Sequence, residues 1–126
     1  MKLLVVLLVA FGSAFSFALT QSSAPQQTTP TKQYFIAIFS RGPEWVADKQ
    51  ANEQVGFKEH SANLQRLRAE KRIPIGGRYA DKGMVIVEAK DEAEAHLLFD
   101  GDVMLQKKTF VLELHQFRPF YKGAIE

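Results

Sequence analysis

The chain contains no cysteine, and this absence excludes several kinds of stabilisation and chemistry. Disulfides, a lipid-modified cysteine and thiolate metal sites are all ruled out. An excess of charge of one sign is also lacking, because sixteen lysine and arginine residues are interspersed with fourteen aspartate and glutamate residues. This balance does not favour nucleic acid as a partner. The domain must therefore hold together by packing.

Two well-known catalytic signatures are missing as well. The pair Gly76-Gly77 is not followed by lysine and serine or threonine, so it is not a phosphate-binding loop. Ser40 and Ser61 are not flanked on both sides by the glycines of a nucleophile elbow. These absences predict no cofactor and disfavour nucleophilic hydrolase chemistry.

The long hydrophobic run of the chain is confined to its beginning. Lys2 is followed by an apolar run over residues 3–11, and the small residues Ser16 and Ala18 stand at positions minus three and minus one of a predicted cleavage site. The run is too short for a comfortable membrane span. Residues 1–18 are therefore predicted to be a signal peptide, which makes the protein secreted or periplasmic, with no membrane partner after cleavage.

The rest of the chain divides by composition into three parts. Residues 19–32 are rich in glutamine, serine, threonine and proline, which predicts a disordered linker. Residues 33–123 have a globular composition and predict a single domain, followed by a short tail at 124–126. A domain of roughly ninety residues is near the small end of what one core sustains, so oligomer formation would stabilise it.

Residues 33–123 alternate between strand and helix patterns. Strands are predicted over residues 34–40, 73–79, 84–89 and 109–117, and helices over 54–72 and from Asp91 onward. Asp91 and Glu94 form a predicted capping box. The order is βαββαβ, an α+β domain. Both faces of the first strand are apolar, so we expect helices on one side of the sheet and a partner chain on the other.

The predicted helix at 54–72 carries a histidine in an unusual place. Phe57, Leu64 and Leu67 fall on one apolar stripe at a period of 3.6 residues, and His60 lies within that stripe. The ring of His60 is therefore expected to face the interior. A histidine in such a position is commonly a core residue with satisfied nitrogens, although it can also serve as an acid or base.

Several short motifs over residues 33–123 resemble a YCII-related domain. They are His60, Gly76-Gly77, Gly83-Met84, Asp102, Glu113-Leu114-His115 and Phe120-Tyr121-Lys122-Gly123. Two positions depart from the family pattern, because Val103 stands where proline often follows the aspartate and Arg78 stands where proline often follows glycine. These departures concern loop geometry more than the fold.

The resemblance implies a fold and an assembly. The fold is a ferredoxin-like βαββαβ sandwich, in which two helices cover one face of a four-stranded antiparallel sheet. Such domains usually form homodimers of the dimeric α/β barrel type through the open faces of their sheets.

The resemblance also implies a site, in which His60 and Asp102 meet as a general acid/base pair in a pocket. A carboxylate beside an imidazole fixes its tautomer and holds it ready to accept or donate a proton. We therefore expect a cofactor-free lyase or isomerase acting on a small cyclic or aromatic molecule, with Gly76, Gly77 and Arg78 as substrate-binding residues.

Two other functions remain open. In the first, His60 and Asp102 are a structural hydrogen-bonded pair in a non-catalytic ligand-binding or assembly module. The second is a monooxygenase that uses neither haem nor flavin, which no residue here favours.

Other polar and aromatic residues allow weaker hypotheses. Glu113 and His115 share one face of a strand and can be read as a second acid/base pair or metal edge, although interface or solvent contacts are the commoner role and no metal is predicted. His96 is expected to be exposed. Trp45, Phe57 and Tyr79 are either pocket-lining or core residues.

Overall fold

The computed structural model describes residues 31–121 and 123. The predicted signal peptide, the C-terminal tail and all of the predicted linker except its last two residues lie outside this part. The elements follow in the order β1 (Gln33–Arg41), η1 (Ala51–Glu53), α1 (Phe57–Ala69), β2 (Ile75–Tyr79), β3 (Lys82–Ala89), α2 (Glu92–Leu97), α3 (Val103–Gln106) and β4 (Phe110–Phe117).

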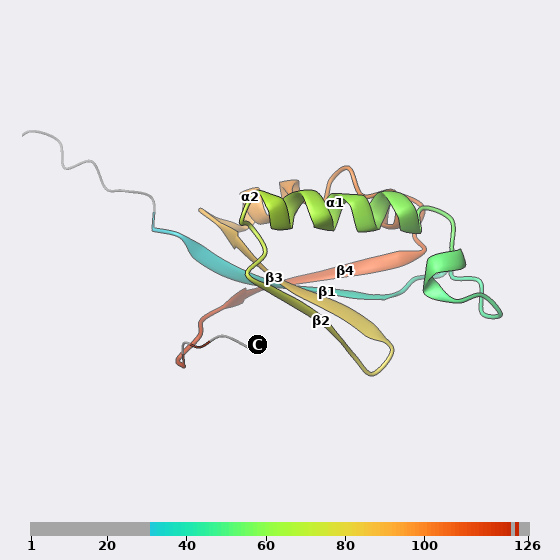
Figure 1. The fold of residues 1–126 in the computed structure, drawn as a ribbon, viewed down its shortest axis with the longest axis horizontal. Coiled ribbons are helices and arrows are strands. Elements are labelled where there is room, and N and C mark those ends of the chain that lie inside the picture. The colour runs from blue at the N-terminus through green and yellow to red at the C-terminus, as the bar shows by residue number, and fades with distance from the viewer. Residues whose placement is uncertain (1–30, 122, 124–126) are drawn as a thin grey trace, which may run out of the picture.

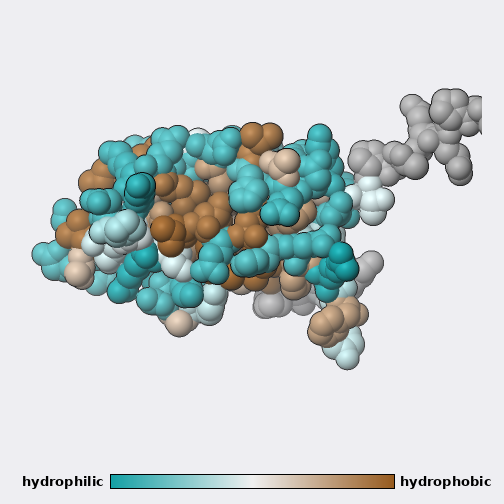
Figure 2. Space-filling model, turned by 180° about the vertical axis from the view of Figure 1, so that it is seen from behind, coloured by the Kyte–Doolittle hydropathy of each residue, from teal (hydrophilic) through white to brown (hydrophobic). Residues whose placement is uncertain are grey.

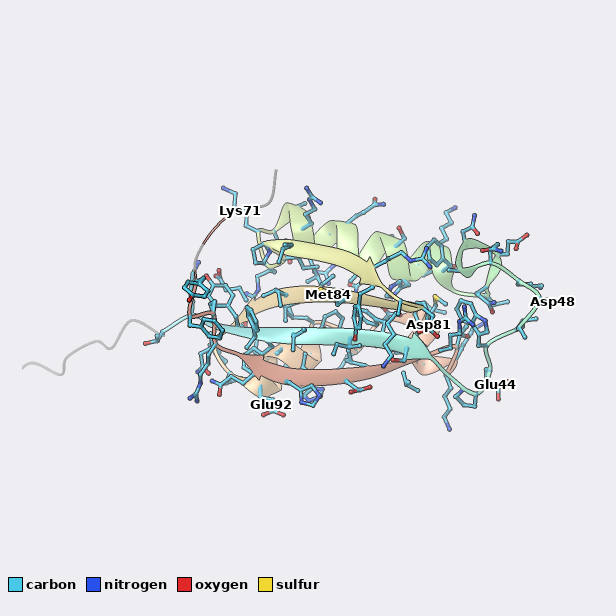
Figure 3. All side chains as sticks on the ribbon, turned by 90° about the horizontal axis from the view of Figure 1, so that it is seen from below. Glu44, Asp48, Lys71, Asp81, Met84 and Glu92 are labelled. Atoms are coloured by element: carbon cyan, nitrogen blue, oxygen red, sulfur yellow. The ribbon has the colours of Figure 1, made fainter. Side chains whose placement is uncertain are left out.

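The four strands form one sheet in the order β2-β3-β1-β4, and every neighbouring pair is antiparallel. Figure 1 shows the helices on one side of this sheet, and Figure 3 looks on to its other face. The α+β class and the four-stranded antiparallel sheet are confirmed, in an arrangement compatible with the ferredoxin-like sandwich. One helix, α3, was not predicted.

The core lies between the sheet and the helices because alternate strand residues point to that side. Phe35, Ala37 and Phe39 of β1 are at most 2% exposed and pack with Leu67 of α1, which is fully buried. The packing is less complete towards the sheet edge, where Leu112 of β4 is only half-buried. Figure 2 shows apolar side chains gathered in the middle of the rear face, bordered by hydrophilic ones.

The opposite face of the sheet is apolar along β1, as predicted, whereas β4 contributes Glu113 and His115 to it. Tyr34, Ile36 and Ile38 alternate with the core residues and are half-buried, while Ile75 and Val111 on the two edge strands are exposed. Figure 3 shows this face with Met84 on β3 near its centre. A sheet face of this kind needs cover to remove its apolar side chains from water.

Helix α1 is shorter than the predicted 54–72 at both ends. At its start, Gly56 is in the left-handed region with φ of 89°. The side chain of Gln54 instead binds the backbone of Val46, donating to its carbonyl at 2.8 Å and accepting from its N–H at 3.1 Å. At its end, Lys71 adopts φ of 59°, and the N–H of Arg72 closes the last turn on the carbonyl of Leu67. Both turns depend on local backbone geometry that apolar periodicity does not report.

Helix α2 has Asp91 as its N-cap, as predicted, but Glu94 accepts from the N–H of Lys90 rather than from that of Asp91 as in a capping box. The carboxylate of Asp91 accepts from the N–H of Glu94 at 2.8 Å, and the carboxylate of Glu94 accepts from the N–H of Lys90 at 2.6 Å. The guanidinium of Arg72, followed by the N–H of Lys90, lowers the pKa of Glu94. The charged form of Glu94 is therefore favoured.

Candidate active site

A cleft of about 790 Å³ opens between α1 and the hairpin of β2 and β3. Its space has a simple origin, because Gly76 and Gly83 occupy hairpin positions that face the helix layer and supply no side chain to fill it. The loop between β1 and α1 contributes Trp45, which stacks on Phe110 with ring centroids 5.7 Å apart. Apolar side chains from several elements complete the wall, namely Phe39, Phe57, Leu64, Ile73, Val85 and Phe110.

His60 is at the end of the first turn of α1 and lines the cleft. Its residue exposure is only 6%, because aromatic rings enclose it. The ring of Phe39 approaches edge-on with centroids 4.9 Å apart, and the ring of Phe110 does so at 5.3 Å. The prediction that His60 faces the interior is confirmed. These rings restrict how the imidazole can turn, so its two nitrogens are held in defined directions.

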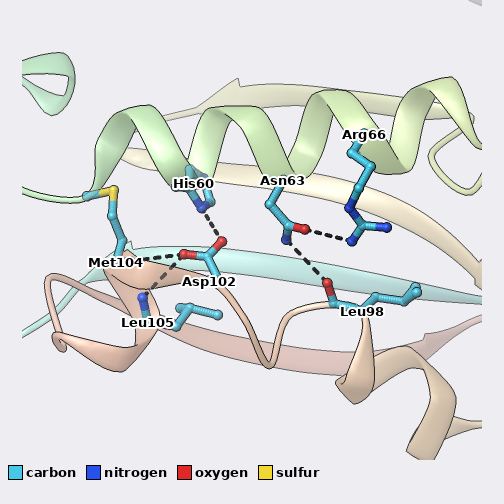
Figure 4. A network of polar contacts seen from close by, with 7 residues as sticks. All are labelled: His60, Asn63, Arg66, Leu98, Asp102, Met104 and Leu105. Atoms are coloured by element: carbon cyan, nitrogen blue, oxygen red, sulfur yellow. Dashed lines mark hydrogen bonds and ion pairs between the residues drawn. The ribbon is translucent and has the colours of Figure 1, made fainter.

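Asp102 is completely buried and meets His60 from the start of α3, which packs beside α1. Its Oδ2 lies 2.5 Å from His60 Nδ1, and its Oδ1 accepts from the N–H groups of Met104 at 3.1 Å and Leu105 at 3.4 Å (Figure 4). Asp102 is thus the N-cap of α3 as well as the partner of the histidine. Both oxygens have partners, so the carboxylate is fixed in orientation.

This geometry determines the tautomer of the neutral imidazole. A carboxylate only accepts, so the proton of the ring resides on Nδ1 and the lone pair on Nε2. Nε2 makes no hydrogen bond with any described residue. It also differs from the buried, unpartnered polar atoms of the described residues in retaining some solvent access. Because His60 lines the cleft and Asp102 does not, a proton acceptor is presented to the cleft.

The three predicted binding residues also lie at the cleft. Gly76, Gly77 and Arg78 of β2 all line it together with His60. Trp45 and Phe57 line it too, whereas Tyr79 is 45% exposed and lies outside it. All of the predicted site residues therefore line the cleft except Asp102, which contacts His60 from behind. Tyr79 is separated from the other two aromatic residues.

The sequence reasoning missed four cations of the cleft lining, Arg41, Lys49, Arg68 and Lys82. A signal was present for two of them. Arg41 is two residues after the core residue Phe39 on the same strand face, and Arg68 is eight residues after His60 on the same helix stripe. Charged residues at such positions extend an apolar face into a polar rim.

The remaining histidines are not part of this cleft. His115 lies 3.7 Å from Glu113 on the open sheet face, and its side chain is 63% exposed. His96 is exposed as predicted, at 55% of its side chain. Within residues 31–121, no three histidine and acidic side chains gather closely enough to hold a metal ion. None of the helices in that same part is long and apolar enough to cross a membrane.

The cleft therefore combines a buried His-Asp pair, an apolar wall and a cationic lining. Three aromatic rings, those of Phe39, Phe57 and Phe110, lie around the histidine. Comparison with protein-family models, with curated proteins and with solved structures finds no match to this chain.

Proposed function

We propose that residues 33–123 form a YCII-related domain acting as a cofactor-free acid/base enzyme, of lyase or isomerase type, on a small cyclic or aromatic molecule. One observation carries the proposal: His60 Nδ1 and Asp102 Oδ2 are 2.5 Å apart at the wall of a large cleft. The pairing leaves Nε2 as the proton acceptor. A positioned base is what proton abstraction requires, and no further cofactor is needed for it.

The surroundings of the pair support this role. A volume of about 790 Å³ is within the usual range of small-molecule sites, and the aromatic wall suits a cyclic ligand. The binding roles proposed for Gly76, Gly77 and Arg78 rest on their place in the same wall. The bare backbone at the glycines lets a ligand approach closely.

A neutral aromatic probe tests whether His60 is a usable base. In 5-nitrobenzisoxazole, a base removes the proton of the isoxazole carbon, the electron pair of that C–H bond forms a nitrile, and the N–O bond breaks to release a phenolate. We expect the protein to accelerate this ring opening, and His60→Gln to lower the rate by about 100-fold, since general bases contribute about 10²–10⁴. Phenolate absorbance measures the rate.

Two further variants sharpen the result. Asp102→Asn keeps an acceptor for the cap but turns an amide N–H₂ towards Nδ1, which moves the ring proton to Nε2, so its rate is expected to fall as well. His115→Gln, on the open sheet face, should leave the rate unchanged. If the protein and His60→Gln react equally fast, His60 is not a base reachable from the cleft.

The alternative is a ligand-binding or assembly module in which the pair is structural. It is favoured by the double use of Asp102, whose Oδ1 caps α3 while Oδ2 holds the histidine. In that case ligand binding survives loss of the pair and no base-dependent reaction occurs. The probe reaction separates the two functions, because only the enzyme needs Nε2.

We further propose that the mature protein is exported and forms a homodimer of the dimeric α/β barrel type through the open faces of two ferredoxin-like sandwiches. The apolar side chains of that face support the dimer, as does the small size of the domain. Sedimentation equilibrium should give twice the chain mass, and Ile38→Lys should give the monomer mass. The exposed Ala62→Lys on α1 is the control. A monomer in the unmodified protein contradicts this assembly.

A further inference from the structure

The cleft lining carries far more positive than negative charge. Five cationic side chains line it, namely Arg41, Lys49, Arg68, Arg78 and Lys82, against the single carboxylate of Asp81. The chain as a whole is nearly balanced, with sixteen cations and fourteen carboxylates. The imbalance is therefore local to the cleft, where low-dielectric walls strengthen the field of the charges.

None of these five cations is neutralised by the protein. No carboxylate of the described residues lies within ion-pair distance of them. Arg66 shows the contrast: two residues before Arg68 on the same helix, it pairs with Glu70 at 2.9 Å and binds the Asn63 side chain at 2.8 Å. A guanidinium without a partner retains its full set of donors for a carboxylate or other anion.

The cations surround an apolar interior and come from different elements. Arg68 follows His60 by eight residues along α1, about 12 Å at the usual helical rise. Arg78 stands on the opposite wall, and Arg41 lies over the ring of Trp45 at 5.0 Å. An apolar ring can thus be held between the helix and the hairpin while an anionic group meets the cationic lining.

We infer that the ligand of this cleft is a small organic anion, in which an apolar ring carries a carboxylate or a comparable oxyanion. This inference rests on the proposed role of His60 and names the class of its substrate. When Nε2 takes a proton from carbon, the C–H bond breaks, an N–H bond forms and the electron pair stays on the substrate. If that pair is delocalised on to an oxygen, the cationic lining stabilises the resulting enolate or phenolate.

Benzoate and benzamide are a matched pair of probes, because they share a ring and differ in charge. We expect benzoate to shift the NMR signals of Trp45 and His60 in a saturable manner and to bind at least about tenfold more tightly than benzamide. Arg68→Gln should weaken benzoate up to about fivefold, and the double variant with Arg78→Gln further. The affinity should fall at high salt, because four of the five cations, Arg41, Lys49, Arg68 and Arg78, are exposed.

Arg66→Gln is the control, since it removes the same charge from the same helix outside the cleft. Equal affinity for benzoate and benzamide overturns the inference, as does a loss in Arg66→Gln as large as in Arg68→Gln, or the absence of saturable shifts. The neutral benzisoxazole reaction is independent of these outcomes. Reaction without anion preference refutes this substrate class alone, whereas anion binding without reaction refutes the enzyme alone.

Discussion

Replacing Asp102 by alanine is expected to lower the free energy of unfolding by about 3 kcal/mol, whereas asparagine at the same position costs less than about 1 kcal/mol. Alanine removes the cap of α3, worth about 1 kcal/mol, and leaves buried His60 Nδ1 without its partner, worth about 1–3 kcal/mol. Asparagine retains an oxygen for the N–H groups of Met104 and Leu105 and a polar group beside the ring. Urea unfolding measures both variants.

The exposed neighbour Asp100 provides the control, because its side chain has no hydrogen bond among the described residues. Asp100→Ala should change stability by less than about 0.5 kcal/mol. For a domain of this size, the loss in Asp102→Ala corresponds to a decrease in melting midpoint of about 10–20 °C. If Asp102→Asn is as unstable as Asp102→Ala, the hydrogen-bonded pair is chiefly a structural feature. A change as small as that of Asp100→Ala excludes the buried pair.

Replacing Gly42 by alanine is expected to cost about 2 kcal/mol or more and to disturb the cleft, although it adds only one methyl group. An added Cβ would lie 2.1 Å from the carbonyl oxygen of Lys108 and 2.9 Å from its carbon. Both atoms belong to backbone, so the chain itself must shift. Gly42 is held there by its N–H, which donates to the carbonyl of Thr109 at 2.8 Å.

The shift would separate the loop that carries Trp45 from the segment leading into Phe110, and so break the stacking of these two rings. Trp45 is the one tryptophan of the chain, so its fluorescence reports both the local change and global unfolding. Gly101→Ala is the matched control, since its added Cβ meets nothing within 4 Å. Equal stability of the two variants would show that the contact between Gly42 and Lys108 is not maintained in solution.

Local patterns predicted the elements whose formation depends on neighbouring residues. A run of aromatic and β-branched residues ended by a turn placed the strand at 34–40 within the observed β1, and the capping residue Asp91 placed the start of α2. Helix α3 was not predicted, because a helix of four residues is too short to show a periodic pattern of apolar residues. Its N-cap Asp102 has the sequence surroundings of a turn residue. The stop of α1 depends on the left-handed Lys71, a conformation that its residue type does not reveal.

Part of the site could be predicted from local sequence patterns, and part depends on contacts between distant segments of the folded chain. Periodicity alone predicted that His60 faces the interior, because the direction of a side chain on a helix depends only on that helix. Its partnership with Asp102, 42 residues away, was implied by the resemblance and has its geometry only in the folded chain. Of the cationic lining only Arg78 was predicted, because the other cations come from the end of β1, a loop, α1 and the start of β3.

By itself, the sequence determined the composition of each element, the two apolar faces of the sheet and the inward direction of His60. The tertiary structure decided which side chains share a space. It placed the carboxylate of Asp102 beside the imidazole of His60. It also placed the hairpin glycines opposite α1, which leaves space for the cleft, and brought the five cations to the lining of that cleft. The physical reason is that burial preference acts residue by residue along the chain, whereas a cleft is defined by the packing of elements that are distant in sequence.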